Sequence, residues 1–94
     1  MRISHRDAET ISRIVSSHDP VAVVKLFGSQ VRDDAAGGDI DLLILSSRIS
    51  LFERLQIESD LQDVFGVRQF DIIVARPETV DPFVRLVSNE AVAL

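Results

Sequence analysis

Two short stretches decide the fold: LFGSQVR at residues 26–32 and GGDIDLL at residues 37–43. The first ends a β-branched run with a glycine that breaks the strand, and its Ser29 is a good N-cap for a two-turn helix ending near Ala36. The second stretch breaks that helix with two glycines and then begins an apolar strand over 39–45. Together they predict a strand, a turn with a short helix, and a second strand.

Apolar spacing and breaking residues on either side of these stretches predict the other elements. The expected helices cover residues 5–17, 29–36, 50–66 and a last segment that begins at Asp81-Pro82, and the expected strands cover 21–27, 39–45 and 67–75. This alternation predicts an α/β (α+β) fold in which helices pack on a small sheet of about three strands. At 94 residues the chain is expected to form a single domain over 1–94. The five phenylalanines are expected in its core, and His5 and His18 at its surface.

The composition excludes several classes of function. Fifteen acidic residues against ten basic ones give a net charge of −5, and no basic cluster is present, so nucleic-acid binding is disfavoured. The chain has no cysteine, which excludes disulfides, thiolate catalysis and cysteine zinc sites. No apolar run is long enough to span a membrane and no targeting signal is visible, so we expect a cytoplasmic protein that makes no membrane contact.

Two half-sites carry the candidate chemistry. Asp39 and Asp41 are two apart on a predicted strand, so both carboxylates point to one face with Cα atoms roughly 6.5–7 Å apart. This spacing lets both reach one or two hard cations, and oxygen ligands of this kind suit Mg²⁺. Gly28 and Ser29 complement them, because a glycine lets the backbone approach a phosphate and a helix N-terminus directs free N–H groups at it. Arg32, near Ser29 on the same helix, is either a phosphate contact or a solvated surface residue.

The positions of the two half-sites constrain the sheet. The phosphate cradle follows the C-terminal end of the first strand, whereas the carboxylates stand at the N-terminal end of the second. If both belong to one site and the strands are neighbours, those strands run antiparallel, which predicts a mixed sheet. Asp71 is the natural third carboxylate, because it is a charge within an apolar strand and a buried carboxylate is normally paired or metal-bound. A structural ion pair with Arg68 or Arg76 is the alternative for Asp71.

The same residues resemble the motifs of a known family. Phe27-Gly28-Ser29, Arg32, the Asp39-Ile40-Asp41 segment and Phe70-Asp71-Ile72-Ile73 look like those of the minimal nucleotidyltransferases of the polymerase-β-like superfamily. The resemblance implies the nucleotidyltransferase fold, with ATP as substrate and Mg²⁺ as cofactor. It further implies that Gly28 and Ser29 hold the nucleotide triphosphate, that Asp39 and Asp41 bind Mg²⁺, and that Asp71 activates an acceptor hydroxyl.

The resemblance also implies a partner. Such proteins are typically encoded beside a HEPN-domain toxin, act as its antitoxin and transfer AMP from ATP to tyrosine hydroxyls of the toxin. Two other functions stay open. One is a binding module that neutralises a partner by surface contact and has lost affinity for ATP, since Asp33 adds negative charge near the predicted cradle. The other, which is disfavoured, is a small-molecule nucleotidyltransferase. The sequence leaves the oligomeric state open, including a homo-oligomer.

Overall fold

The fold was analysed in a computed structural model that describes residues 3–28, 39–66 and 69–94. In chain order its elements are α1 (His5–Ser16), β1 (Val23–Phe27), β2 (Ile40–Leu45), α2 (Leu51–Phe65), β3 (Phe70–Ala75), α3 (Pro82–Glu90) and β4 (Val92–Ala93). These bounds lie within a few residues of the expected ones. The short helix expected over 29–36 lies outside the described residues.

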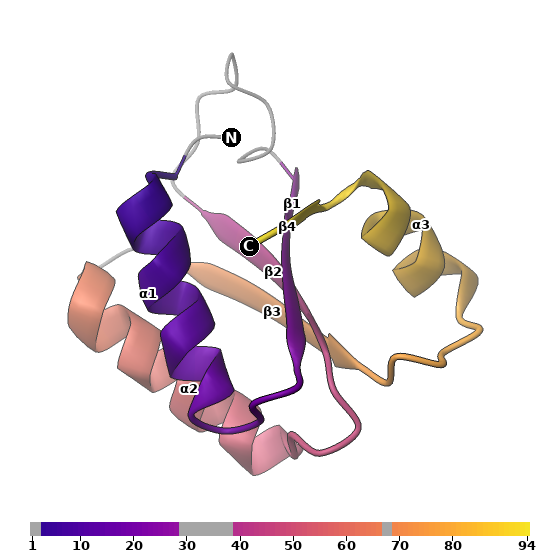
Figure 1. Ribbon diagram of the computed structural model, residues 1–94, viewed down its shortest axis with the longest axis horizontal. Coiled ribbons are helices and arrows are strands. Elements are labelled where there is room, and N and C mark those ends of the chain that lie inside the picture. Colours follow the sequence, from indigo (N-terminus) through magenta and orange to yellow (C-terminus); the bar gives the residue numbers. More distant parts are fainter. Residues whose placement is uncertain (1–2, 29–38, 67–68) are drawn as a thin grey trace.

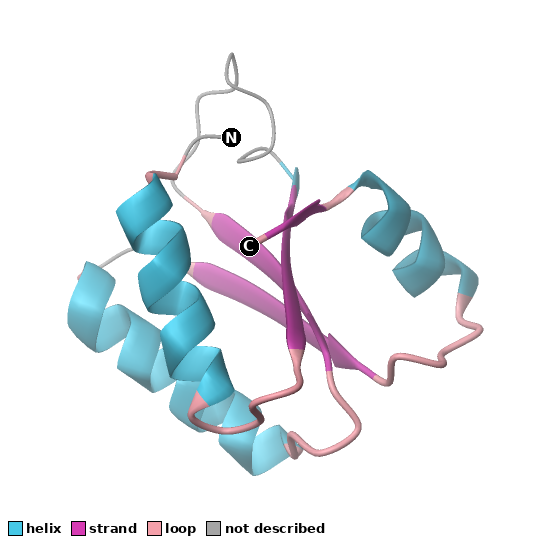
Figure 2. Cartoon of the chain, viewed as in Figure 1, coloured by secondary structure: helices cyan, strands magenta, loops and turns pink. Residues whose placement is uncertain are grey.

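The strands form one mixed sheet in the order β3-β2-β1-β4, which is the central layer in Figure 2. β1 runs antiparallel to β2, as the shared-site argument predicts, and β2 runs parallel to β3. A parallel pair needs a long crossover connection, and α2 provides it. The sheet has one strand more than the expected three or so, because Val92 and Ala93 near the C-terminus pair antiparallel with β1.

The helices lie on both sides of the sheet. Figure 1 shows α1 and α2 side by side on one side and α3 on the other. Because side chains alternate along a strand, one face of the sheet carries the main core. That core joins residues of α1 and α2 to alternate strand residues; its fully buried members are Ile11, Val15, Leu26, Ile40, Leu42, Ile44, Ile57 and Leu61. The odd-numbered residues of β2 and β3, which include Asp41 and Asp71, therefore lie on the face opposite α1 and α2.

Side-chain caps determine where the helices begin. Ser4 accepts a hydrogen bond from the Asp7 N–H at 3.0 Å before α1, and Ser50 forms a capping box with Glu53 before α2. Asp81 accepts from the N–H groups at the start of α3, with Pro82 at the first helical position. Within the described ranges, none of the helices is both long and apolar enough to cross a membrane.

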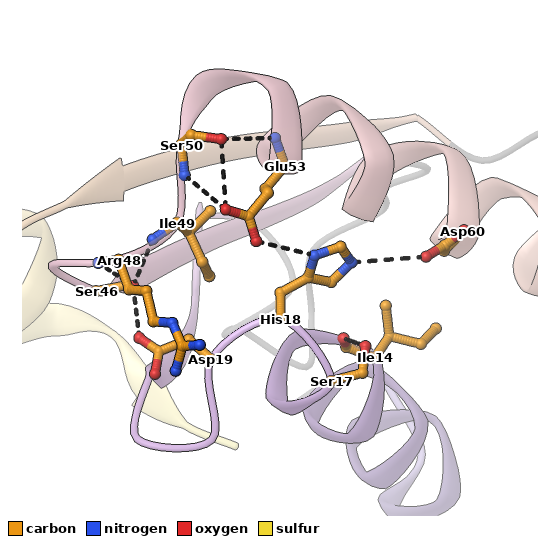
Figure 3. Close-up of polar contacts among 10 residues, drawn as sticks. All are labelled: Ile14, Ser17, His18, Asp19, Ser46, Arg48, Ile49, Ser50, Glu53 and Asp60. Carbon is orange, nitrogen blue, oxygen red and sulfur yellow. Dashed lines mark hydrogen bonds and ion pairs between the residues drawn. The ribbon is translucent and has the colours of Figure 1, made fainter.

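A polar cluster joins the end of α1 to the segment between β2 and α2 (Figure 3). Asp19 is 1% exposed and accepts hydrogen bonds from the Ser46 hydroxyl at 2.6 Å and from the Val21 N–H at 3.1 Å. The Ser46 oxygen in turn accepts from the Ile49 N–H at 3.0 Å. The expectation of a surface position is wrong for His18, whose side chain is 15% exposed, because it packs between two acidic side chains of α2.

The expectation that all phenylalanines belong to the core is also wrong. Phe70 is buried and its ring lies 5.9 Å from that of Phe65. Phe52 in α2 and Phe83 in α3 are instead 68% and 54% exposed. Both stand in the first turn of their helix, and α3 buries none of its residues, so neither ring reaches the core.

Candidate functional site

One row of residues across the sheet carries the candidate site. Phe27 of β1 pairs with Asp41 of β2, and Asp41 pairs with Asp71 of β3. Residues paired laterally point to the same face, so the two aspartates are neighbours on the face away from α1 and α2. Asp39 precedes β2 by one residue and therefore lies two positions from Asp41 along the chain. The structure thus brings together the three carboxylates that the sequence singles out.

The central carboxylate, that of Asp41, feels the charge of both neighbours. Burial raises the pKa of Asp41 above its usual value, and the negative charges of Asp71 and then Asp39 raise that pKa further. Asp41 is half-buried, whereas Asp39 and Asp71 are exposed. The central carboxylate is therefore the one whose charge the surroundings oppose most.

Gly28 brings the end of β1 into the same place. Its φ of 74° lies in the left-handed region that favours glycine, directly after the strand. A Cβ atom added to Gly28 would lie 3.0 Å from Cγ of Asp41 and would overlap its Oδ2 atom. The predicted cradle and the predicted carboxylates are thus in contact. Ser29, Arg32 and Asp33 lie outside the described residues.

Asp71 differs from the expectation in one respect. The sequence predicts a buried charge that requires a partner, but the side chain is exposed because β3 is the outermost strand of the sheet. The ion pair with Arg76 is not what the structure shows, since Arg76 lies 3.7 Å from Glu78 instead. Arg68 is outside the described residues. An exposed acid at the sheet's edge is accessible to an incoming molecule.

The donor chemistry of the site fits a hard cation. Over 3–28, 39–66 and 69–94, no three His, Asp or Glu side chains are already arranged as a metal-binding group. Asp39, Asp41 and Asp71 nonetheless offer only oxygen ligands, and the mutual repulsion that raises the pKa of Asp41 is what a bound cation would relieve. The chemistry of these ligands therefore suits Mg²⁺.

A polar contact between Lys25 of β1 and Ser88 of α3 lies on this face. The Lys25 ammonium donates to the Ser88 hydroxyl at 2.9 Å and to the Ser88 carbonyl at 3.3 Å. Lys25 is two residues before Phe27 on β1, so it lies on the same face as the aspartates. The contact attaches α3 to β1 beside the site. The sequence offered only a lysine within an apolar strand, without indicating its partner.

Comparison with known proteins agrees with this geometry. The family model described as "Polymerase beta, Nucleotidyltransferase" matches residues 9–94, a span that includes Gly28 and all three aspartates. A solved structure of a proposed minimal nucleotidyltransferase is similar with a TM-score of 0.57 and 26% sequence identity, over 98% of this chain and 100% of the other. Comparison with curated proteins gives no significant match.

Proposed function

This chain belongs to the polymerase beta nucleotidyltransferase family, and on that premise we propose that it transfers AMP from ATP to a hydroxyl group of a protein, in a reaction that depends on Mg²⁺. The observation that carries the proposal is the row formed by Asp41 and Asp71, with Gly28 against Asp41. Gly28 is the candidate phosphate cradle and Asp71 the candidate proton acceptor, and they lie on opposite sides of Asp41.

The proposed roles combine this order with the resemblance to minimal nucleotidyltransferases, on which the roles of Ser29 and Arg32 rest. Gly28 and Ser29 hold the triphosphate beside β1, and Arg32 contributes positive charge to it. Asp71, on the outer strand, accepts the proton of the acceptor hydroxyl. The hydroxyl oxygen forms a bond to the α-phosphorus, the bond to the β-phosphate oxygen breaks in line, and pyrophosphate leaves.

Asp39 and Asp41 are the proposed ligands of Mg²⁺, together with Asp71. When bound, Mg²⁺ supplies the positive charge that stabilises the oxygens of the reacting phosphate. The carboxylates keep their negative charge for this role, which the raised pKa of Asp41 opposes until a cation is present. Cation and nucleotide are therefore expected to bind together.

The accessibility of Asp71 supports a macromolecular acceptor. An exposed acid on the outermost strand can receive a hydroxyl that is itself part of a folded surface. The resemblance to minimal nucleotidyltransferases supports a HEPN-domain toxin as that acceptor, with a tyrosine as the modified residue and this chain as the antitoxin. The reaction would then neutralise the toxin by covalent modification.

Incubation with labelled ATP, Mg²⁺ and a candidate HEPN-domain partner tests the proposal. We expect label on the partner with the wild type, none after chelation of Mg²⁺, and none with Asp41→Asn. Asp63→Asn, which removes an exposed carboxylate of α2, is the matched control and keeps the activity. Equal labelling by wild type and Asp41→Asn, or no labelling of any acceptor by the wild type, would contradict the enzymatic proposal.

A second function is favoured by a different observation. Val80, Phe83 and Leu86, at and within α3, are all more than half exposed. Apolar side chains gathered on one element favour a partner surface, so the chain could neutralise its partner by contact alone. Neutralisation by an Asp39→Asn/Asp41→Asn variant, combined with its loss in Phe83→Ser/Leu86→Ser, would establish this function over catalysis.

A further inference from the structure

Gly28 affects the site in a second way, separate from contact with phosphate, because it leaves space beside the Asp41 side chain. A Cβ atom at residue 28 would occupy the space that Oδ2 of Asp41 fills, while remaining at an ordinary 3.4 Å from Cβ of Asp41. The overlap is thus confined to the carboxylate. Apart from the chain neighbours of Gly28, the three nearest atoms to this Cβ all belong to Asp41.

We infer that Gly28 is a positioning residue for Asp41: the missing side chain leaves free the space at the end of β1 that the Oδ2 atom of this carboxylate occupies, in the row that continues to Asp71. This inference rests on the proposed function for its consequence, since it assigns how the central ligand is held. Any side chain at residue 28 forces the carboxylate to rotate out of that place.

The position of the Asp41 side chain supports the inference. It is half-buried on β2, and its Oδ2 atom lies beside the end of β1, in the space that a Cβ of residue 28 would need. A shift of about 1 Å in a positioned group can reduce a reaction rate on the order of 100-fold. A glycine that determines this position therefore affects function without touching the reacting atoms.

The chain contains a matched control for testing this. Gly66, after α2, has a φ of 77°, close to the 74° of Gly28, but apart from its own helix and chain neighbours no atom of the described residues lies within 4 Å of the place of its Cβ. Gly28→Ala and Gly66→Ala therefore both place a side chain at a positive φ, and we expect each to lower the Tm, on the order of 5–10 °C. Only Gly28→Ala also displaces a carboxylate.

The experiment compares crystal structures of the two variants without ligand and their Mn²⁺ affinities in the presence of a non-hydrolysable ATP analogue. In Gly28→Ala we expect the Asp41 carboxylate to rotate away while the backbone of β2 stays in place, and Mn²⁺ affinity to fall at least about tenfold. In Gly66→Ala we expect the Asp41 carboxylate to stay in place and the Mn²⁺ affinity to equal that of the wild type. An unmoved Asp41 carboxylate, or an unchanged Mn²⁺ affinity despite the rotation, would overturn the inference.

Two outcomes separate this inference from the proposed function. If the wild type binds no Mn²⁺ with the analogue, the proposed function fails, and the crystal structures alone decide whether Gly28 positions Asp41. If Gly28→Ala does not fold, the Gly28→Ala/Asp41→Ala double variant decides. If the double variant folds, the result supports a clash between the residue 28 side chain and the Asp41 carboxylate. If it still does not fold, while Gly66→Ala does, that clash is ruled out as the cause.

Discussion

Asp19 and Asp41 are both withdrawn from water in the same small fold, yet their surroundings act in opposite directions. The Ser46 hydroxyl lowers the pKa of Asp19 by hydrogen bonding, followed by smaller effects from the Val21 N–H and Arg48, against the opposing effect of burial. Burial and neighbouring carboxylates raise the pKa of Asp41. The surroundings of Asp19 therefore favour its charged form, whereas the surroundings of Asp41 disfavour its charged form.

We propose that this difference distinguishes an acid that supports the fold from one that serves a ligand. A fully hydrogen-bonded carboxylate stabilises the chain and has no free capacity. A crowded carboxylate costs stability, which a protein tolerates where function needs it. The pair therefore offers a direct test of the proposed site, because removal of each charge should affect a different property.

The largest effect is expected for Asp41→Asn. Under the proposed function, loss of the central carboxylate should reduce nucleotidyl transfer about 1,000-fold or more, because a charge proposed to hold the cation is gone. Its Tm should be equal to or above that of the wild type, since the substitution removes repulsion from Asp71 and Asp39. Labelling kinetics and thermal unfolding measure the two. A variant that is both active and destabilised would place Asp41 with the structural acids.

Asp19→Ala should show the reverse pattern. The Ser46 hydroxyl and the Val21 N–H lose their acceptor in a buried place, so the Tm should fall by several degrees, on the order of 5 °C or more. Transfer activity below the new Tm should stay near that of the wild type. Loss of activity at a temperature where the variant is folded would mean that the two regions are coupled.

The pH dependence of stability sharpens the comparison. Because the folded pKa of Asp19 lies below 3.8, its contribution is fully present above that pH and is lost as the pH falls through the folded pKa. Asp41 has the opposite sign: its folded pKa lies above 3.8, so its charge destabilises the fold at neutral pH and protonation on acidification relieves this. Urea midpoints between pH 7 and pH 3 measure both. Asp41→Asn should lack the gain in stability that the wild type shows on mild acidification. Asp19→Asn should lack the loss of stability that the wild type shows at lower pH. Curves that coincide with the wild type would contradict the two assignments.

The smallest effect is expected for His18→Gln. His18 lies 3.3 Å from Glu53 and 3.8 Å from Asp60, whose side chains are themselves partly exposed. Such contacts contribute about 0.5–1 kcal/mol. Urea unfolding should therefore show a modest loss, and transfer should be unchanged. A loss above about 2 kcal/mol would indicate that His18 is a principal link between α1 and α2.

The sequence predicts most of this fold because its signals are local. Ser50 and Asp81 mark the starts of helices through hydrogen bonds within their own turns, and these bounds are confirmed. The antiparallel pairing of β1 with β2 is not local, yet it follows from requiring that Gly28 and Asp41 share one site. Function thus supplied a constraint on topology that propensity alone lacks.

What the sequence could not predict depends on contacts between distant segments. The two residues of β4 have no strand pattern, and only their pairing with β1 makes them a strand. His18 is like any polar helix-end residue until α2 places Glu53 and Asp60 beside it. In the site, the spacing of Asp39 and Asp41 predicted their proximity, and the apolar strand around Asp71 marked it as the third acid. The exposure of Asp71 instead depends on the position of β3 at the edge of the sheet.

That outer position of β3 has a consequence for hydrogen exchange. The Ile40 N–H donates to the Gln69 carbonyl and the Ser46 N–H to the Ala75 carbonyl, so the odd-numbered residues of β3 bond toward β2. In a parallel ladder the residues between them direct their own N–H groups outward. The amides of Phe70, Ile72 and Val74 therefore face solvent at the rim of the sheet although two of their side chains are buried, and deuterium should enter this strand at every second residue.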